Sequence, residues 1–179
     1  MPGTFTLGET TPAPVRRPRT ASSLKRWDNE RVSALTPILS SPGWELLESL
    51  QAKQATNPIP LPELGSALRA AGLYAELVVA VLTQLALRQA ARSKFGPFAS
   101  HMVFTRDGLE QATRLVVAAR HAQRFRDCGA TRVADLGCGI GSDAMAIAGR
   151  GMNVLAVDID PDTAGAVAAN LRAFEGAEV

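Results

Sequence analysis

The chain has 179 residues, of which 46% are hydrophobic and 20% are charged, and its formal net charge is +2. This composition is typical of a globular protein with a packed core, and the net charge is too small to indicate a nucleic-acid partner by itself. Its two cysteines, Cys128 and Cys138, have no metal-ligand spacing and cannot supply a framework of disulfides. We therefore expect neither a metal site nor a fold that depends on disulfides.

The first 31 residues form a basic segment that contains prolines. Six arginines and lysines stand against three acidic residues, and four prolines interrupt the stretch. Such a segment buries too little apolar surface to offset the entropy of ordering, so residues 1–31 are predicted to be a disordered tail. The alternative is a basic arm that strengthens RNA binding through phosphate contacts.

Residues 32–103 are predicted to form a small helical region. Ser41 is the expected N-cap of its first long helix, and a second helix is expected over residues 62–71, where Gly72 stops it. The third and longest helix is predicted to end before Gly96. Its apolar residues recur at helical spacing and predict a buried stripe, namely Tyr74, Leu77, Val78, Val81, Leu82 and Leu85.

The end of that third helix is basic. Arg88, Arg92 and Lys94 lie near its C-terminus, where cations stabilise the helix dipole. This structural interpretation is sufficient, and contact with RNA is the alternative.

No segment of the sequence predicts contact with a membrane. The longest apolar run, residues 77–87, is too short to cross a bilayer. The first thirty residues lack the apolar core of a secretory signal. A cytoplasmic location is therefore expected.

A further helix is predicted to begin near residue 105. Thr105 or Asp107 can cap it, and Asp107 and Glu110 have the spacing of a capping box. Because this helix leads into a strand that carries a ligand-type loop, residues 104–113 are expected to close one side of a pocket. The expected inward face of the helix is Leu115, Val116, Ala119 and Ala122.

The most informative feature is VADLGCGIGSD, residues 133–143, followed by VLAVDID, residues 154–160. The first segment predicts a buried strand, a glycine turn and a helix that starts near Gly141, and the second predicts another strand. Two strands joined in this way are parallel neighbours whose carboxyl ends share one edge of the sheet. Asp158, at the end of the second strand, is therefore expected beside the glycines.

These residues predict a nucleotide-type cofactor site. Gly137, Gly139 and Gly141 allow the backbone to adopt left-handed angles and to approach a ligand directly. Asp158 can accept hydrogen bonds from both hydroxyls of a ribose, as an acidic residue at about this interval does in dinucleotide-binding folds.

Two residues favour S-adenosylmethionine over a nicotinamide or flavin cofactor. The nicotinamide fingerprint needs a third glycine at the position of Ser142. Asp135, just before the loop, would repel a pyrophosphate but suits the cationic amino or sulfonium group of S-adenosylmethionine.

The motifs resemble those of the class I S-adenosylmethionine-dependent methyltransferases, since DLGCGIG is similar to their first motif and VDID to their second. The resemblance covers about residues 104–179. Within that superfamily, GMNVLAVDIDP and AANLRAFEGA are similar to the trimethylguanosine synthase branch and its RNA-methylating bacterial relatives. The segment KFGPFASHMVFTRDGLEQATRLVVAARHAQRF resembles the helical lead-in of an actinobacterial group that has a THUMP-like domain further on.

The resemblance implies an α/β, Rossmann-like class I methyltransferase fold, S-adenosyl-L-methionine as cofactor and RNA as substrate. It carries over no catalytic residue, because class I enzymes usually place their reacting residues after the fourth strand, and this chain is expected to stop at Val179 before a third strand. Asp135 is expected near the methionine amino group and Asp158 on the ribose. The implied cofactor-binding residues are Asp135, Gly137, Cys138, Gly139, Gly141 and Asp158.

The remaining polar residues of this half have structural interpretations. Asp143 and Asp160 are predicted to stabilise helix N-termini, and Cys138 to pack or to contact the cofactor without acting as a nucleophile. His101 and His121 are isolated in the sequence and are predicted to be structural or exposed.

Residues 104–179 are thus predicted to be the N-terminal half of a methyltransferase domain. Two strands alone make too little sheet to be stable, so we expect the front part of a longer enzyme, inactive by itself. Three functions stay open. They are a methyltransferase acting on RNA, a nicotinamide-dependent oxidoreductase, and a non-catalytic module that binds an adenosyl ligand or a partner.

Overall fold

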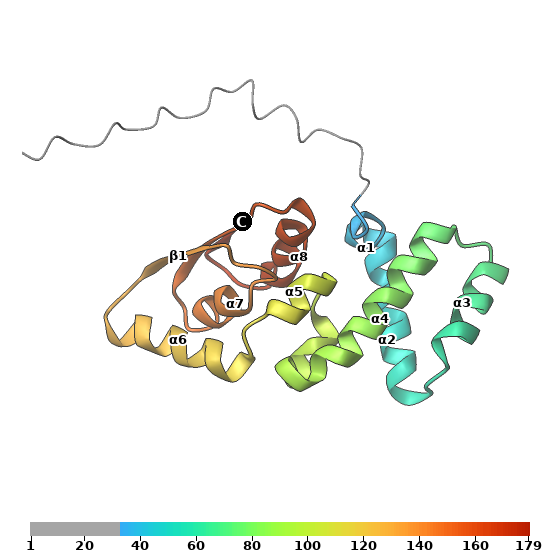
Figure 1. Ribbon diagram of the computed structural model, residues 1–179, viewed down its shortest axis with the longest axis horizontal. Helices are drawn as coiled ribbons and strands as arrows, with labels where there is room; N and C mark the ends of the chain where they lie inside the picture. Colours follow the sequence, from blue (N-terminus) through green and yellow to red (C-terminus); the bar gives the residue numbers. More distant parts are fainter. Residues whose placement is uncertain (1–32) are drawn as a thin grey trace, which may run out of the picture. The chain divides into compact units, whose positions relative to one another are not determined.

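The computed structural model describes residues 33–179, so the predicted disordered tail at residues 1–31 lies outside the described residues. The fold of the described part is α/β: several helices precede a three-stranded parallel sheet whose strands alternate with helices (Figure 1). This arrangement is compatible with part of a Rossmann-like sheet. Within residues 33–179, no helix combines the length and the apolar character that crossing a membrane requires.

The described chain begins with four helices: α1 (Thr36–Leu39), α2 (Ser41–Thr56), α3 (Leu61–Ala70) and α4 (Ala75–Phe95). The helix predicted over residues 62–71 and the stop before Gly96 are confirmed to within one residue. The cap predicted at Ser41 is wrong by one position, because the Oγ of Ser40 accepts the Gly43 N–H at 3.2 Å. Pro42 is therefore the second residue of α2. The first turn of a helix tolerates proline at this position too, since N–H groups there have no partner within the helix.

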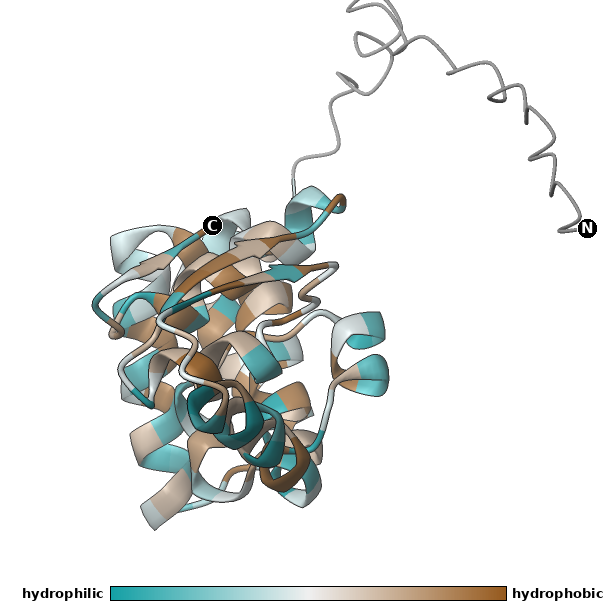
Figure 2. Cartoon of the chain, turned by 90° about the vertical axis from the view of Figure 1, so that its left-hand side faces the viewer, coloured by the Kyte–Doolittle hydropathy of each residue, from teal (hydrophilic) through white to brown (hydrophobic). Residues whose placement is uncertain are grey.

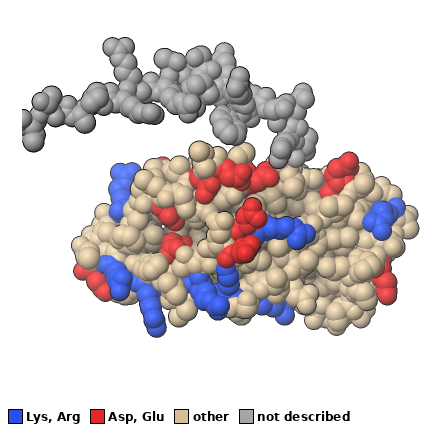
Figure 3. All heavy atoms as spheres, in the orientation of Figure 1, with Lys and Arg blue, Asp and Glu red and all other residues tan. Residues whose placement is uncertain are grey.

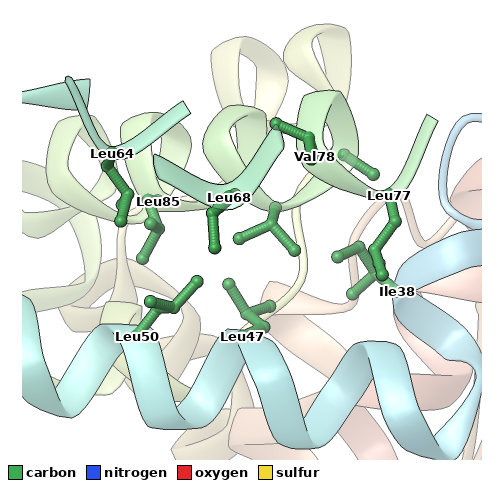
Figure 4. Close-up of a cluster of buried hydrophobic side chains, with 10 residues drawn as sticks. Ile38, Leu47, Leu50, Leu64, Leu68, Leu77, Val78 and Leu85 are labelled. Carbon is green, nitrogen blue, oxygen red and sulfur yellow. The ribbon is translucent and has the colours of Figure 1, made fainter. Parts of the chain in front are cut away.

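Helices α2, α3 and α4 enclose an apolar core (Figure 4). Most of the stripe predicted along α4 contributes to it, namely Leu77, Val78, Val81, Leu82 and Leu85. Tyr74 is a wrong prediction, because it is 56% exposed. It occupies the N-cap of α4, where the backbone has already left the helical path, so the helical period does not place its side chain.

Two buried polar side chains of α4 join this region to the extended segment that follows it. Gln84 exchanges two hydrogen bonds with the backbone of Phe104, at 2.7 and 3.0 Å. Arg88, only 1% exposed, donates from Nε to the Met102 carbonyl and pairs with Glu48, both at 2.9 Å. Desolvation lowers the pKa of Arg88, and the Glu48 carboxylate opposes that shift. These side chains satisfy backbone groups that have no strand partner.

The next elements are the 3₁₀ helix η2 (Gly96–His101), α5 (Arg106–Gln111) and α6 (Leu115–Asp127). Thr105 caps α5, since its Oγ1 accepts the Gly108 N–H at 3.0 Å, which confirms one of the two predicted caps. The chain leaves the helix between α5 and α6, so the single helix expected here is two. The predicted burial of Ala122 is confirmed, whereas that of Val116 is wrong, because Val116 is 61% exposed and Ala118 is buried instead.

Lys94 caps the C-terminal end of α5. Its Nζ donates to the carbonyls of Leu109, Glu110 and Ala112, at 2.8, 2.6 and 3.2 Å. With Arg88 buried and Lys94 engaged in this way, the basic end of α4 has a structural role. The alternative of RNA contact is wrong for Arg88, which solvent hardly reaches.

The sheet consists of β1 (Arg132–Leu136), β2 (Asn153–Val157) and β3 (Ala177–Glu178), connected by α7 (Ser142–Ala148) and α8 (Pro161–Leu171). The predicted parallel pair is confirmed, with Arg132 opposite Asn153 and Leu136 opposite Val157. The expectation that the chain stops before a third strand is wrong, because β3 pairs in parallel with residues 154–155. A strand of two residues has too little alternation for a sequence pattern to detect.

One face of the sheet is covered and the other is open. Helices α6, α7 and α8 share a buried cluster with Val154 and Ala156 of β2. Alternate residues along each strand point to the opposite face, where Leu136 is 76% exposed and Leu155 and Val157 are also exposed. Figure 2 shows the hydropathy of these strands. Parallel sheets commonly have both faces covered, so the described sheet has an uncovered apolar face.

Replacing Arg88 measures how much its contacts with the Met102 carbonyl and with Glu48 stabilise the fold. Arg88→Ala removes a buried side chain and leaves the Met102 carbonyl without its donor, so the free energy of unfolding is expected to fall by about 2–5 kcal/mol. Chemical denaturation measures this loss. Arg92→Ala, at an exposed position one turn further along α4, is the matched control and should change the value by less than about 0.5 kcal/mol. Equal effects of the two substitutions would contradict the role given to Arg88.

Candidate functional site

A cavity of about 1200 Å³ opens at the carboxyl ends of β1 and β2. The loop after β1, the turn after β2 and the start of α8 line one side of it, and α4, α5 and residues 33–37 line the other. The prediction that residues 104–113 close one side is confirmed, and Figure 1 shows α5 between α4 and α7. Ligands of open α/β sheets usually bind at this edge.

The loop after β1 combines backbone hydrogen bonds with left-handed glycines. The Gly137 N–H donates to the Val157 carbonyl at 2.7 Å. Gly139 has a φ of +57°, and Gly141, the N-cap of α7, has a φ of +86°. A Cβ at Gly139 would meet no atom within 4 Å, whereas one at Gly141 would lie 2.5 Å from Cγ2 of Val167. Gly139 therefore keeps the cavity surface open, and Gly141 allows α7 to pack against α8.

Asp158 connects this loop to the turn after β2. Its Oδ2 accepts the Gly139 N–H and its Oδ1 accepts the Asp160 N–H, both at 3.0 Å. The structure thus brings Asp158 beside the glycine loop, where the sequence predicts it. Each carboxylate oxygen can accept more than one hydrogen bond, so both oxygens keep capacity for a ligand. The contact with Gly139 is a second task for Asp158 that the sequence pattern did not indicate.

Asp135 lies in β1 and lines the same cavity. Its Oδ2 is buried and has no hydrogen-bond partner among the described residues. Desolvation raises the pKa of Asp135, and the carboxylates of Asp143 and Asp158 raise it further. A ligand cation with N–H donors would supply the missing partner and would lower the pKa again.

Ser142 presents a second polar group without a partner. It is the first residue of α7, lines the cavity and is only 4% exposed, and its Oγ has no partner among the described residues. Most buried polar atoms are hydrogen-bonded. Gln51 and Arg88 also have a buried polar atom without a partner, but of the four residues only Asp135 and Ser142 line the cavity.

Cys138 lines the cavity and is buried in the cluster that contains α7. Burial raises the pKa of its thiol to about 11, with contributions from the Asp135 and Asp158 carboxylates. The thiol is therefore protonated at neutral pH and is a poor nucleophile, in agreement with the predicted role in packing or ligand contact. Cys128 is exposed and does not line the cavity.

The structure places the two residues predicted at helix N-termini, Asp143 and Asp160, and the two histidines. Asp160 caps α8, since its Oδ1 accepts the Thr163 N–H at 2.8 Å, as predicted. Asp143 lies in the first turn of α7 and contacts Nδ1 of His121 at 2.7 Å, so His121 is not isolated. The side chain of His101 is exposed. Among residues 33–179, no cluster of three or more His, Cys, Asp or Glu side chains could hold a metal ion.

The contribution of α4 to the cavity was missed by the sequence analysis. The residues of α4 at the cavity are Ala75, Glu76, Val79, Ala80, Thr83, Gln84 and Leu87. One signal was present in the sequence: Val79 is an apolar residue outside the stripe that packs into the helical core. Whether Val79 lines a cavity depends on which element faces α4, and the spacing of residues along one helix does not show this.

Comparison with known proteins gives a match to the first part of the described chain. A family model described as Domain of unknown function (DUF8688) matches residues 31–91, less than half of the chain. In the described part these residues cover α1, α2, α3 and most of α4, so the match includes one wall of the cavity but not the glycine loop. Neither a curated protein nor a solved structure matches the chain.

Alanine at two loop glycines is expected to have unequal effects. Gly139→Ala places a Cβ in open space at a left-handed φ, so it should cost about 1–2 kcal/mol of stability. Gly141→Ala adds the clash with Val167 and should cost at least about 1 kcal/mol more. Chemical denaturation measures both losses. In a Val167→Ala background the loss of stability caused by Gly141→Ala should be smaller than in the unaltered chain, and equal losses in the two backgrounds would contradict the steric explanation.

Asp135→Asn is expected to stabilise the protein at neutral pH. The folded-state pKa of Asp135 is raised above its ordinary value of 3.8, so the charged carboxylate is disfavoured by folding. The gain should be present at pH 7 and should vanish as the pH falls below 3.8, where the group is neutral in both states. Urea unfolding across this range measures it. Asp162→Asn is the control and should give no gain, and a loss of stability for Asp135→Asn at pH 7 would contradict the assignment.

Proposed function

We propose that the protein is an S-adenosyl-L-methionine-dependent methyltransferase and that its described part contains the binding site for the methyl donor. The observation that carries the proposal is the buried Oδ2 of Asp135, which lacks a partner and lies beside a loop of left-handed glycines. No described residue donates a hydrogen bond to this oxygen, and the amino group of S-adenosylmethionine is a cationic donor that could do so.

The residues present fit this cofactor. Asp135 would bind the methionine amino group, the Ser142 hydroxyl would donate to its carboxylate, and Asp158 would accept from the ribose hydroxyls. Gly139 leaves space for the ligand next to the backbone. The cofactor supplies an electrophilic methyl group, and the contribution of this chain is to orient it and to exclude water.

A nicotinamide cofactor is the less favoured alternative. Its pyrophosphate would lie near the carboxylates of Asp135, Asp143 and Asp158, and Arg106 is the one basic side chain among the described residues that line the cavity. The third hypothesis, a non-catalytic module, predicts the same binding as the methyltransferase but no transfer. Catalytic residues stay unassigned, and RNA as the methyl acceptor is a prediction from the resemblance alone.

Calorimetry with S-adenosylhomocysteine and with NADH tests the proposal. The unaltered chain is expected to bind S-adenosylhomocysteine and not NADH. Asp158→Ala should weaken binding by about 5- to 150-fold, equivalent to about 1–3 kcal/mol, because paired hydrogen bonds are lost. Asp162→Ala, a cavity residue with no role in the glycine loop, is the control and should have a small effect.

Three results bear on the alternatives. No binding of S-adenosylhomocysteine to a folded chain, as judged by circular dichroism, would contradict the proposal. Binding of NADH with comparable affinity would favour the oxidoreductase. Transfer of a labelled methyl group to cellular RNA would separate the methyltransferase from a non-catalytic module.

A further inference from the structure

Helix α6 lies in a strongly basic stretch of the chain. Residues 112–134 contain five arginines against one acidic residue, whereas the net charge of the whole chain is only +2. All five are exposed, and none forms an ion pair within the part of the chain that the structure describes. The arginines are Arg114, Arg120, Arg124, Arg126 and Arg132. This stretch therefore presents a positive surface to the solvent.

The exposed side of α6 combines two of these arginines with an aromatic ring. The opposite side of the helix packs into the protein, where Ala118 and Ala122 are buried. Arg120 and Arg124 are four residues apart, so they are neighbours on the helix surface. Phe125 follows Arg124 directly and is 42% exposed. We name Arg120, Arg124 and Phe125 the α6 strip.

Helix α6 is connected to the cavity at two points. Thr113, two residues before the helix begins, lines the cavity. His121, which follows Arg120 directly, contacts the Asp143 carboxylate at 2.7 Å, and Asp143 also lines the cavity. A chain-like ligand bound along the α6 strip can therefore continue to the mouth of the cavity.

The cavity and the α6 strip have charges of opposite sign. Seven acidic residues line the cavity, and Arg106 is the one basic residue among the described residues there. Figure 3 shows acidic side chains gathered near the middle of the face in view and basic ones along its lower left edge, where Figure 1 shows α6. A polyanion is therefore attracted to α6 and repelled from the cavity, while an uncharged group can enter the cavity.

A nucleic-acid strand has this distribution of charge, with ionised phosphates along its backbone and uncharged bases beside them. Arginine binds phosphate well, and an exposed aromatic ring stacks on an unpaired base. Proteins that recognise RNA mostly contact single-stranded loops and ends, where bases are accessible. We propose that the α6 strip binds single-stranded RNA, with Arg120 and Arg124 on phosphates and Phe125 on a base. The proposal rests on the proposed function only in taking this RNA as the methyl acceptor.

Titration of a short fluorescein-labelled oligouridine with the full chain, followed by fluorescence anisotropy, tests the α6 strip. Binding by the unaltered chain is expected to weaken as salt rises, because phosphate contacts release counterions. The double variant Arg120→Ala/Arg124→Ala should bind about tenfold or more weakly. Its slope of log affinity against log salt should be smaller by about 1.4, roughly 0.7 for each lost contact with a single strand.

The matched control removes the same charge elsewhere. The double variant Lys53→Ala/Arg69→Ala changes exposed residues of α2 and α3, and its affinity should change by less than about twofold, because salt screens distant charges. Equal losses for the two double variants would overturn the proposal, since net charge alone would then explain binding. Absence of binding by the folded, unaltered chain would overturn it as well.

Phe125→Leu separates base stacking from charge. It removes the aromatic ring and keeps an apolar side chain, so the affinity should fall by about fivefold or more while the salt slope stays the same. Phe98→Leu is the control, since Phe98 of η2 is also exposed, and it should leave the affinity unchanged. An unchanged affinity of Phe125→Leu would overturn the assignment to RNA and would indicate a general surface for polyanions. Tighter binding of phosphatidylserine vesicles than of RNA, dependent on Arg120 and Arg124, would overturn it in favour of a membrane.

Photocrosslinking with an oligouridine that contains 4-thiouridine locates the bound strand. Crosslinks are expected within residues 104–128, which extend from the cavity to the end of α6. Crosslinks confined to residues 1–31 would overturn the proposal and would assign RNA binding to the basic N-terminal segment. None of these measurements needs the methyl donor. Failure of S-adenosylhomocysteine to bind would contradict the proposed function and leave the result for α6 standing, whereas absence of RNA binding would contradict the α6 strip alone.

Discussion

The carboxylate of Asp158 sets the geometry on which the cavity depends. Because β1 and β2 are parallel and paired along their full length, their following loops emerge at one edge of the sheet. Asp158 then accepts one N–H from each loop, from Gly139 and from Asp160. The first of these hydrogen bonds connects the glycine loop to the turn after β2, and the Asp158 carboxylate also lines the cavity. The Asp158 side chain thus connects the end of β2 to the glycine loop that borders the cavity.

Two buried side-chain amides link α4, which forms the opposite wall of the cavity, to the sheet half through the segment between η2 and α5. Gln84 of α4 exchanges hydrogen bonds with Phe104, and Asn170 of α8 does so with Val103 while also donating to the Ile140 carbonyl of the glycine loop. The extended segment between η2 and α5 is therefore bound from both sides. A shared core crosses the division predicted between residues 103 and 104, and that division stays a prediction.

Buried polar atoms without a partner occur in both halves of the described chain. Arg88 is buried deeply and binds Glu48 and the Met102 carbonyl, while its Nη1 has no partner among the described residues. Asp135 and Ser142 each keep a buried oxygen without a partner, and the pKa of Asp135 is raised as a result of its burial. Unsatisfied buried polar groups cost stability, and groups with strongly perturbed pKa values are frequent at functional sites. Asp135 and Ser142 differ from Arg88 in that they line the cavity, where a ligand can reach them.

The features that the sequence alone determined are those that act over a few residues. The glycine loop, the Asp160 cap and the parallel strand pair follow from local spacing and from the period of strands and helices, and Asp158 falls beside the loop because the connection between the strands is short. Only the tertiary structure decided that Val116 is exposed, that Arg88 is buried and that α4 forms the second wall of the cavity. Helical spacing gives the relative directions of side chains on one helix. Which direction is covered depends on contacts between elements far apart in the chain.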